Sequence, residues 1–257
     1  MKLARNLFTS ALANHTKQLG LWVSLSSSYA AEVVATSNYD WALLDMEHSP
    51  NDLFSILGQL QAFSQSRTTA IVRPPWNDPI IVKRLLDLGV MGLLFPMIQT
   101  VEEAKKAVAS TVYPPKGIRG VAGSTRANKF GRVTDYLERV EQETAVIVQL
   151  ETVLAVESAD AIADVEGITG VFFGPADIAA DLGIVGQPLD DRIWALIMPA
   201  AKRLIAKGIP VGTLVLDPEF AAKLLNEGFT FVACGADTSI LAKGADNLFS
   251  HVKGALI

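Results

Sequence analysis

Hydrophobic residues along this chain alternate between short β-branched or aromatic runs and longer amphipathic stretches. Eight of the short runs have the length and composition of buried strands, and helical patterns separate them. The predicted strands cover residues 20–25, 41–44, 69–72, 92–95, 146–150, 170–173, 210–214 and 229–233. Repeated strand–helix units with short connections predict an α/β protein, a (β/α)8 TIM barrel in which residues 1–257 form a single domain.

Local end signals position the helices between these strands. Asn51 or Asp52 is expected to cap a helix that begins at Leu53, Gly89 to follow the end of another, and Pro175 to start a third. Residues 1–20 lack a continuous apolar core and give no predicted element. The other predicted helices cover residues 29–37, 78–88, 101–110, 152–163, 193–207, 218–226 and 238–252.

One segment departs from this alternation. Residues 113–136 are rich in Gly, Pro and Arg, and are expected to form a long loop on the ligand-bearing face, since such loops in compact domains are usually functional. A doubly wound sheet is the alternative architecture. It calls for a glycine-rich turn after the first strand, where this chain has Ser26, Ser27 and Ser28.

Composition narrows the class of protein. Half of the residues are hydrophobic and 19% are charged, which allows a large buried core. The net charge is −5 and no basic block occurs, which argues against nucleic acid and anionic membranes as partners. No run reaches the length of a membrane span or has the form of a signal peptide. The single cysteine, Cys234, excludes a disulfide framework and predicts a cytoplasmic protein.

Two carboxylates follow successive strands in the stretch from Val146 to Gly183. Glu151 comes directly after one predicted strand, and Asp177 comes just past the turn Gly174-Pro175-Ala176 that follows the next. Ligands of parallel α/β proteins gather at the carboxyl ends of strands, and carboxylate oxygens suit Mg²⁺ or Mn²⁺. The amides of Ala176 and Asp177 at a helix start could hold a substrate carboxylate. The alternative is that both acids merely cap helices.

The other strand ends add polar groups to the same face. Asp45 and His48 follow the second strand and Arg73 ends the third, while strand alternation puts Gln149 on the same side as Glu151. His48 is a candidate general base, or else a loop histidine that bonds only the backbone. Arg73 could bind an oxyanion, or else form a salt bridge to a nearby acid. No predicted strand ends in lysine, which disfavours Schiff-base chemistry.

Sequence motifs are spread over nearly the whole chain: LLDMEHSPND, IVRPP, KRLLDLGVMGLLFPM, YPPKGIRG, RANKFGR, VQLET and GVFFGPADIAADLG. These motifs resemble those of the HpcH/HpaI family of metal-dependent class II pyruvate aldolases. It implies reversible cleavage of 4-hydroxy-2-oxo acids to pyruvate or hydroxypyruvate and an aldehyde. It also implies one divalent metal ion, Mg²⁺, Mn²⁺ or Co²⁺, that stabilises an enolate.

The resemblance further implies roles for individual residues. Glu151 and Asp177 would bind the metal, and Gln149 with the Gly174-Pro175-Ala176 turn would contact the oxo acid. His48 would be the base and Arg73 the transition-state stabiliser, with Asp45 supporting the histidine loop. Asp87 would act on His48 of an adjoining subunit, in a homohexamer built as a trimer of dimers whose last helix is exchanged between subunits.

Other functions on the same scaffold remain open at this point. Decarboxylation of oxaloacetate and cleavage of a malyl thioester would use the same enolate. A catalytically silent barrel that binds a metabolite is disfavoured because His48, Arg73, Glu151 and Asp177 occur together. Neither the aldehyde nor the choice between pyruvate and hydroxypyruvate follows from the sequence.

Overall fold

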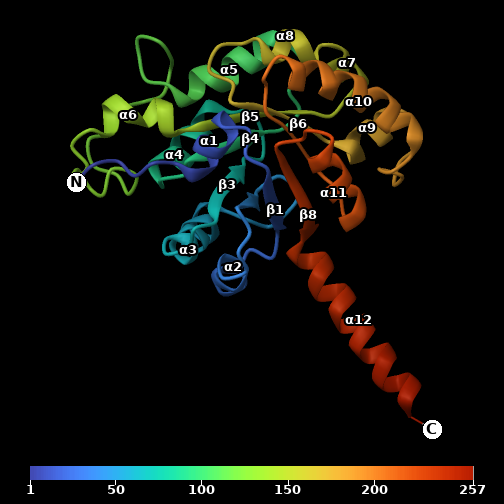
Figure 1. Ribbon diagram of the computed structural model, residues 1–257. Helices are drawn as coiled ribbons and strands as arrows, with labels where there is room; N and C mark the ends of the chain where they lie inside the picture. The colour runs from blue at the N-terminus through green and yellow to red at the C-terminus, as the bar shows by residue number, and fades with distance from the viewer. Residues whose placement is uncertain (257) are drawn as a thin grey trace.

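The computed structural model describes residues 1–256 and contains a closed barrel of eight parallel strands (Figure 1). Each strand pairs with the next in sequence, and the last strand pairs with the first to close the sheet. The predicted (β/α)8 architecture is therefore confirmed. The strands are β1 (Gln18–Val23), β2 (Trp41–Asp45), β3 (Thr69–Arg73), β4 (Gly92–Phe95), β5 (Ala145–Leu150), β6 (Gly170–Phe173), β7 (Val211–Leu214) and β8 (Phe231–Ala236).

Helices surround the barrel, and the three helix ends that the sequence indicates are confirmed. Asp52 is the N-cap of α3, Pro175 is the first residue of α9, and Gly89 follows the end of α4 with a φ of 91°. The predicted helix of residues 152–163 is broken at Ser158 into two short helices. The outer helices are α2 (Ser28–Ala35), α3 (Leu53–Phe63), α4 (Pro79–Asp87), α5 (Val101–Thr111), α6 (Tyr136–Glu143), α7 (Val153–Glu157), α8 (Ala159–Ala163), α9 (Pro175–Asp181), α10 (Asp191–Ala206), α11 (Pro218–Asn226) and α12 (Asp237–Ala255).

A helix that the sequence patterns did not indicate, α1 (Leu7–Ala13), closes the amino end of the barrel. Its Phe8 is fully buried, with ring centroids 5.7 Å from those of both Trp41 and Phe231 inside the barrel. A seven-residue helix has too few positions to show a period and is stabilised mainly by such packing. Because this end is filled with aromatic rings, a ligand has access only from the carboxyl ends of the strands.

The long loop before α6 lies at the opposite end from the one expected. It joins helix α5 to strand β5, so it belongs to the amino end of the barrel, away from the face where ligands bind. Its contacts agree: the amide of Ala127 donates to the carbonyl of Asp87 at the end of α4, and that of Thr134 donates to the carbonyl of Met1. The prediction that residues 113–136 face the ligand is therefore wrong for this chain's own barrel.

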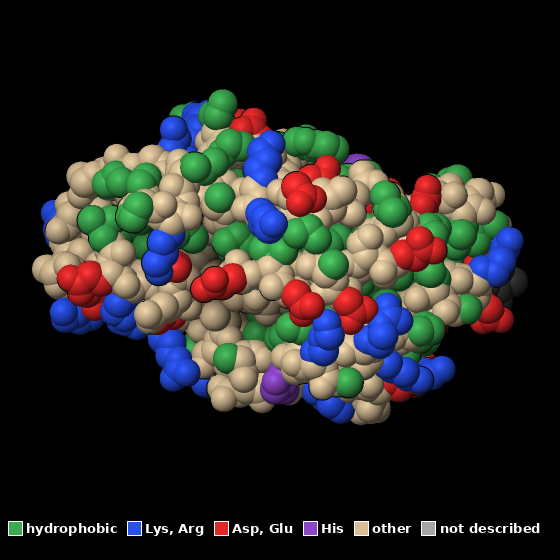
Figure 2. Space-filling model, turned by 90° about the horizontal axis from the view of Figure 1, so that it is seen from above, with side chains coloured by type: hydrophobic (Ala, Val, Ile, Leu, Met, Phe, Trp, Pro, Cys, Tyr) green, Lys and Arg blue, Asp and Glu red, His purple; other side chains and the backbone are tan. Residues whose placement is uncertain are grey.

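The last helix, α12, projects away from the barrel (Figure 1). Of its described residues only Asp237, at its first position, is buried, and its main contacts are with β1 and β8 at its base. Large apolar side chains are exposed along its length at Ile240, Leu241, Leu248 and Phe249. Figure 2 shows acidic and basic side chains interspersed over one face of the molecule. Within residues 1–256, no helix is both long and apolar enough to cross a membrane.

Candidate active site

A cavity of about 330 Å³ opens at the carboxyl ends of the strands. The predicted residues His48, Arg73, Gln149, Gly174, Pro175, Ala176 and Asp177 all line it. Trp22 is 6% exposed and contributes to both core and cavity. The strand-end residues that the sequence placed on one face are thus brought together.

Glu151 lies beneath this cavity and is held by two hydrogen bonds. Its Oε1 accepts from the amide of Met97 at 2.6 Å, and its Oε2 accepts from Nε2 of Gln149 at 2.5 Å. The N-cap of α7 is Thr152, and α9 has no side-chain cap although Asp177 is in its first turn. The structure therefore gives no support to the alternative that these two acids are helix caps.

The surroundings of Glu151 favour a bound cation. Burial, with the charges of Asp177 and Glu47, raises the pKa of Glu151 to about 8, against the hydrogen bond from Met97 and the charge of Arg73. Oε1 of Gln149 is buried and has no hydrogen-bond partner. Two carboxylates and an unsatisfied amide oxygen suit a hard divalent ion that keeps waters in its shell. No group of three or more Asp, Glu, His or Cys residues within residues 1–256 is arranged around a metal position, so substrate and water would complete the shell.

Gly174 allows the chain to pass close to this carboxylate. A Cβ added at Gly174 would lie 2.9 Å from both Cβ and Oε2 of Glu151 and 3.0 Å from Nε2 of Gln149. Any side chain here would displace one of these groups. The Gly-Pro-Ala turn therefore fixes the position of Glu151 as well as the start of α9.

Arg73 is held by two carboxylates on the second strand and the loop after it. Nε and Nη2 donate to Oδ1 and Oδ2 of Asp45 at 2.8 and 2.7 Å, and Nη1 lies 2.8 Å from Oε2 of Glu47. The guanidinium also lies over the ring of Trp22, 5.1 Å from its centroid. The alternative of a salt bridge is thus correct as a description of the contacts. Since a guanidinium has five N–H groups and two of them are donated to Asp45, the remaining ones on Nη1 and Nη2 can serve a ligand in the cavity.

The loop after β2 depends on Asp45. Its carboxylate accepts from the amide of Glu47 at 3.0 Å, and its backbone carbonyl accepts from Nδ2 of Asn51 at 2.6 Å. His48 itself is exposed, with 67% of its side chain accessible and Nε2 3.9 Å from Oε2 of Glu47. Its ring therefore stands at the cavity edge, where it can reach a ligand.

Glu47 contacts two residues of the candidate site, Arg73 and His48, and sequence reasoning did not assign it. Burial raises its pKa, and the charges of Asp45 and Asp177 act in the same direction, against those of Arg73 and His48. Its Oε2 accepts no well-directed hydrogen bond. The available signal was its position between Asp45 and His48, but only the fold shows that its side chain turns toward Arg73.

Asp87 is not among the residues that line this cavity. It ends α4, where Oδ1 is 3.2 Å from Nη2 of Arg119. Arg119 is buried, donates to the hydroxyl of Tyr136 at 3.0 Å, and lies over the ring of Tyr113, 4.5 Å from its centroid. This predicted catalytic residue is thus held at the amino end of the barrel, apart from the other predicted site residues.

Comparison with known proteins identifies the family of this chain. The family described as HpcH/HpaI aldolase/citrate lyase matches residues 18–244, which include every element of the barrel sheet. The chain belongs to this family. HpcH/HpaI proteins of the aldolase/citrate lyase type are lyases, so the chain is an enzyme of this kind.

Individual relatives are similar over nearly their full length. A protein of Rhizobium etli named "Pyruvate aldolase" is 47% identical over 248 residues, which are 96% of this chain and 98% of that protein. An Escherichia coli protein named "4-hydroxy-2-oxo-heptane-1,7-dioate aldolase" is 44% identical over 244 residues, covering 95% and 93% of the two chains. The crystal structure of an HpcH/HpaI aldolase/citrate lyase family protein from Burkholderia cenocepacia superposes with a TM-score of 0.91, at 36% identity over 96% of this chain and 99% of that one.

Proposed function

We propose that this protein is a metal-dependent aldolase that cleaves 4-hydroxy-2-oxo acids to pyruvate or hydroxypyruvate and an aldehyde, and catalyses the reverse addition. The observation that carries the proposal is the meeting of Glu151, Asp177, Arg73 and His48 around one cavity and its floor. No lysine of residues 1–256 lines that cavity, so the chain offers no amine for a Schiff base there.

Glu151 and Asp177 would hold the divalent ion, Mg²⁺, Mn²⁺ or Co²⁺. When bound, such an ion supplies a Lewis acid for the carboxylate and keto oxygens of the substrate. The two carboxylates balance its charge, so an anionic substrate is not repelled. Gln149 and the amide of Ala176 would orient the oxo acid.

Arg73 and His48 would carry out the steps that the protein itself contributes. The N–H groups of Arg73 that Asp45 does not use can share the negative charge that develops on the keto oxygen as the C3–C4 bond breaks. The grip of Asp45 fixes the guanidinium before the substrate arrives. His48, acting through a water molecule, would take the proton of the C4 hydroxyl during cleavage and return it during synthesis.

The same residues could support decarboxylation of oxaloacetate or cleavage of a malyl thioester, but no feature of this cavity favours either reaction. A silent metabolite-binding barrel would have no need for an arginine preorganised beside an exposed histidine. The single cysteine fits a reducing cytoplasm.

An aldol-cleavage screen with and without chelator tests this function. Release of pyruvate or hydroxypyruvate from 4-hydroxy-2-oxo acids should stop with EDTA and return with Mn²⁺, Co²⁺ or Mg²⁺. The Glu151→Gln variant should show weaker binding of Mn²⁺ by calorimetry, independent of turnover. Inactivation by borohydride in the presence of pyruvate, or full turnover after exhaustive chelation, would show that the mechanism is wrong.

We further propose a closed oligomer, a homohexamer arranged as a trimer of dimers, in which α12 is exchanged between subunits. The exposed apolar side chains of α12 need a partner in water. A groove lined by Leu25, Val33 and Val34 lies beside the base of α12. Asp87 would then approach His48 of the partner subunit. Sedimentation of the intact protein tests the assembly, and an active monomer would contradict it.

A further inference from the structure

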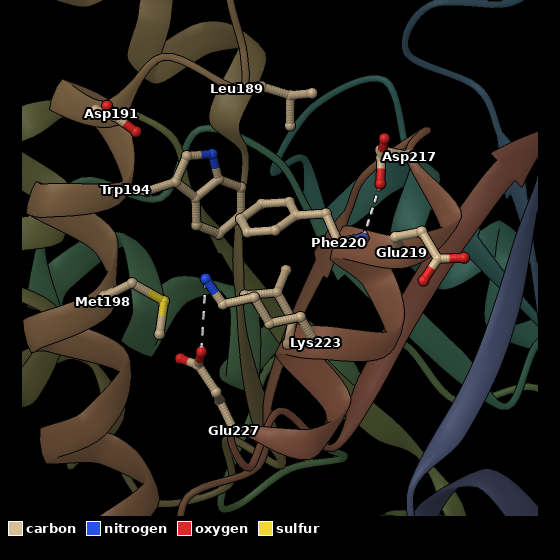
Figure 3. A pocket seen from close by; sticks show the side chains of 10 residues that line it. Leu189, Asp191, Trp194, Met198, Asp217, Glu219, Phe220, Lys223 and Glu227 are labelled. Atoms are coloured by element: carbon tan, nitrogen blue, oxygen red, sulfur yellow. Dashed lines mark hydrogen bonds and ion pairs between the residues drawn. The ribbon is translucent and has the colours of Figure 1, made fainter.

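A second cavity, of about 490 Å³, lies between α10 and α11 (Figure 3). Its aromatic part consists of Trp194 and Phe220, whose rings meet edge to face with centroids 4.6 Å apart. Met198 and Leu224 continue the apolar surface. We call this cavity the side cleft, defined by Trp194, Met198, Phe220 and Leu224.

The side cleft adjoins the active-site cavity. Leu189 and Asp217 line both cavities, so these two side chains form the boundary between them. Nε1 of Trp194 also donates to the carbonyl of Pro188 at 3.0 Å, and Pro188 lines the active site. A substrate that outgrows the active site on this side would therefore pass Leu189 and reach the aromatic rings.

The path from the active site to the side cleft is apolar. Pro188, Leu189, Leu214, Val215 and Leu216 form this wall of the active-site cavity. Leu189 and Leu216 are 49% and 51% exposed. Contact with an apolar ligand would remove the surface of these half-exposed leucines from water, and this burial favours binding of the ligand.

The charges along this path disfavour an anionic group. Arg73 is the one Lys or Arg of residues 1–256 that lines the active-site cavity, and Asp45 and Glu47 already balance its charge. The side cleft is surrounded by the carboxylates of Asp191, Asp217, Glu219 and Glu227 against a single ammonium, that of Lys223. Lys223 pairs with Glu227 at 3.8 Å, as Figure 3 shows. A terminal carboxylate here would meet like charges and no free cation.

We propose that the acceptor aldehyde of this enzyme carries an uncharged aliphatic or aromatic tail, which passes Leu189 and Asp217 and lies against Trp194 and Phe220 in the side cleft. This inference rests on the proposed aldolase function and specifies the class of its second substrate. It assigns Leu189 and Trp194 as specificity-determining residues.

The first test is a series of straight-chain aldehydes from acetaldehyde to octanal, added to pyruvate by the metal-loaded enzyme. If each methylene leaves water, kcat/KM should rise about threefold to fourfold per carbon over the length that the path can hold. Succinic semialdehyde should react on the order of tenfold less well than butanal, which has the same number of carbons and a methyl group in place of the carboxylate. Phenylacetaldehyde should be a good acceptor.

Variants of Leu189 and Trp194 test whether the side cleft causes this dependence on chain length. The quantity measured is the kcat/KM for heptanal divided by that for acetaldehyde. Leu189→Ala and Trp194→Ala should lower this ratio about tenfold, whereas Trp194→Phe should lower it less. Leu189→Arg should raise the kcat/KM for succinic semialdehyde relative to heptanal. Leu154→Ala, which removes a leucine of 55% exposure that lines neither cavity, should leave the ratio unchanged.

The outcomes separate this inference from the function on which it rests. A flat or falling chain-length profile, or a preference for succinic semialdehyde, overturns the inference while acetaldehyde turnover upholds the aldolase. Absence of addition to every aldehyde overturns both. If Trp194→Ala does not fold, the two Leu189 variants decide the question by themselves.

Discussion

Arg73 grips both carboxylate oxygens of Asp45, with Nε and Nη2 at 2.8 and 2.7 Å. The pair joins the adjacent ends of β2 and β3 and is buried, with side chains 7% and 2% exposed. A fork of this kind fixes the plane of the guanidinium, so its remaining N–H groups have a set direction. The same contact therefore has two consequences, one for stability and one for catalysis.

Arg73→Ala should lower both the free energy of unfolding and kcat. It leaves Asp45 and Glu47 buried without their cation, a change that costs about 3–5 kcal/mol in other buried pairs. Loss of an oxyanion donor should lower kcat by about 10²–10³-fold. Arg73→Lys should restore neither fully, because an ammonium cannot make the paired contact. Denaturant unfolding and steady-state kinetics measure the two effects.

A surface pair provides the control for Arg73. Nε of Arg203 lies 2.7 Å from Oδ2 of Asp160, but its side chain is 50% exposed. Arg203→Ala should therefore change the unfolding free energy by less than about 1 kcal/mol and leave kcat unaltered. Equal losses in the two variants would contradict a special role for burial.

The pH dependence of stability should report on Asp45. Burial alone would raise the pKa of Asp45, but the hydrogen bonds and charge of Arg73 outweigh it and lower the pKa below its usual range. A lowered native pKa stabilises the fold above the unfolded pKa, about 3.9, and this contribution is lost as the pH falls through the native value. Asp45→Asn lacks the contribution at every pH. The Tm of the wild type should thus exceed that of Asp45→Asn at pH 7, and the gap should narrow as the pH falls below about 4, the unfolded pKa, and through the lower native pKa.

The sequence was sufficient for the barrel because every repeat carries its own local signal. Apolar runs defined all eight strands, and Asp52, Gly89 and Pro175 marked helix ends through backbone chemistry that needs no tertiary contact. α1 was not predicted because its Phe8 packs against Trp41 and Phe231, which are distant in sequence, and the local cap at Asn6 is followed by only seven helical residues.

The sequence predicted which residues meet in the candidate site, but it did not predict their contacts. Strand order alone placed Glu151, Asp177 and Arg73 at one end, since the carboxyl ends of parallel strands coincide. The direction of the Glu47 side chain was hidden, because a loop after a strand has no fixed alternation. The loop of residues 113–136 was assigned to the wrong end because its length was taken as the signal, whereas its place between a helix and a strand decides the matter.

His48 should act as a base without holding the metal. His48→Ala is expected to lower kcat by about 10²–10⁴-fold, the range for loss of a general base, with Mn²⁺ affinity kept. Glu47→Gln tests the newly found neighbour, whose Oε2 is 3.9 Å from Nε2 of His48. If Glu47 acts through His48, the double variant should be no slower than His48→Ala. Additive losses would show that Glu47 has a separate role.

Gly174→Ala should impair the metal site without changing a donor. The new Cβ would lie 2.9 Å from Oε2 of Glu151, so the carboxylate or the turn must shift. We expect Mn²⁺ affinity to fall by about 10- to 100-fold, as for other changes that disturb a ligand's support, and calorimetry measures this directly. Gly123→Ala is the control, because a Cβ there meets nothing within 4 Å. Unchanged affinity in Gly174→Ala would mean that Glu151 is free to move.

Asp87 provides the test of a site shared between subunits. It is held by Arg119 at 3.2 Å and does not line the cavity of its own chain. Asp87→Asn should keep the metal and the assembly while lowering kcat. If Asp87 acts on His48 of the partner subunit, each site takes Asp87 from one subunit and His48 from another. Hexamers formed from equal amounts of Asp87→Asn and His48→Ala subunits should then have full activity at about a quarter of their sites, because random mixing brings an intact Asp87 and an intact His48 together with that frequency.

A second mixture separates exchange between subunits from other causes of recovery. Glu151 and His48 serve the same chain's cavity, so Glu151→Gln and His48→Ala subunits should not restore each other. A mixture of Asp87→Asn and Glu151→Gln subunits should regain activity, again at about a quarter of the sites. Recovery in the mixture of Glu151→Gln and His48→Ala subunits, or no recovery in either mixture, would show that Asp87 does not act across an interface. The stopped-flow release of pyruvate by each mixture, compared with its unmixed parents, measures the result.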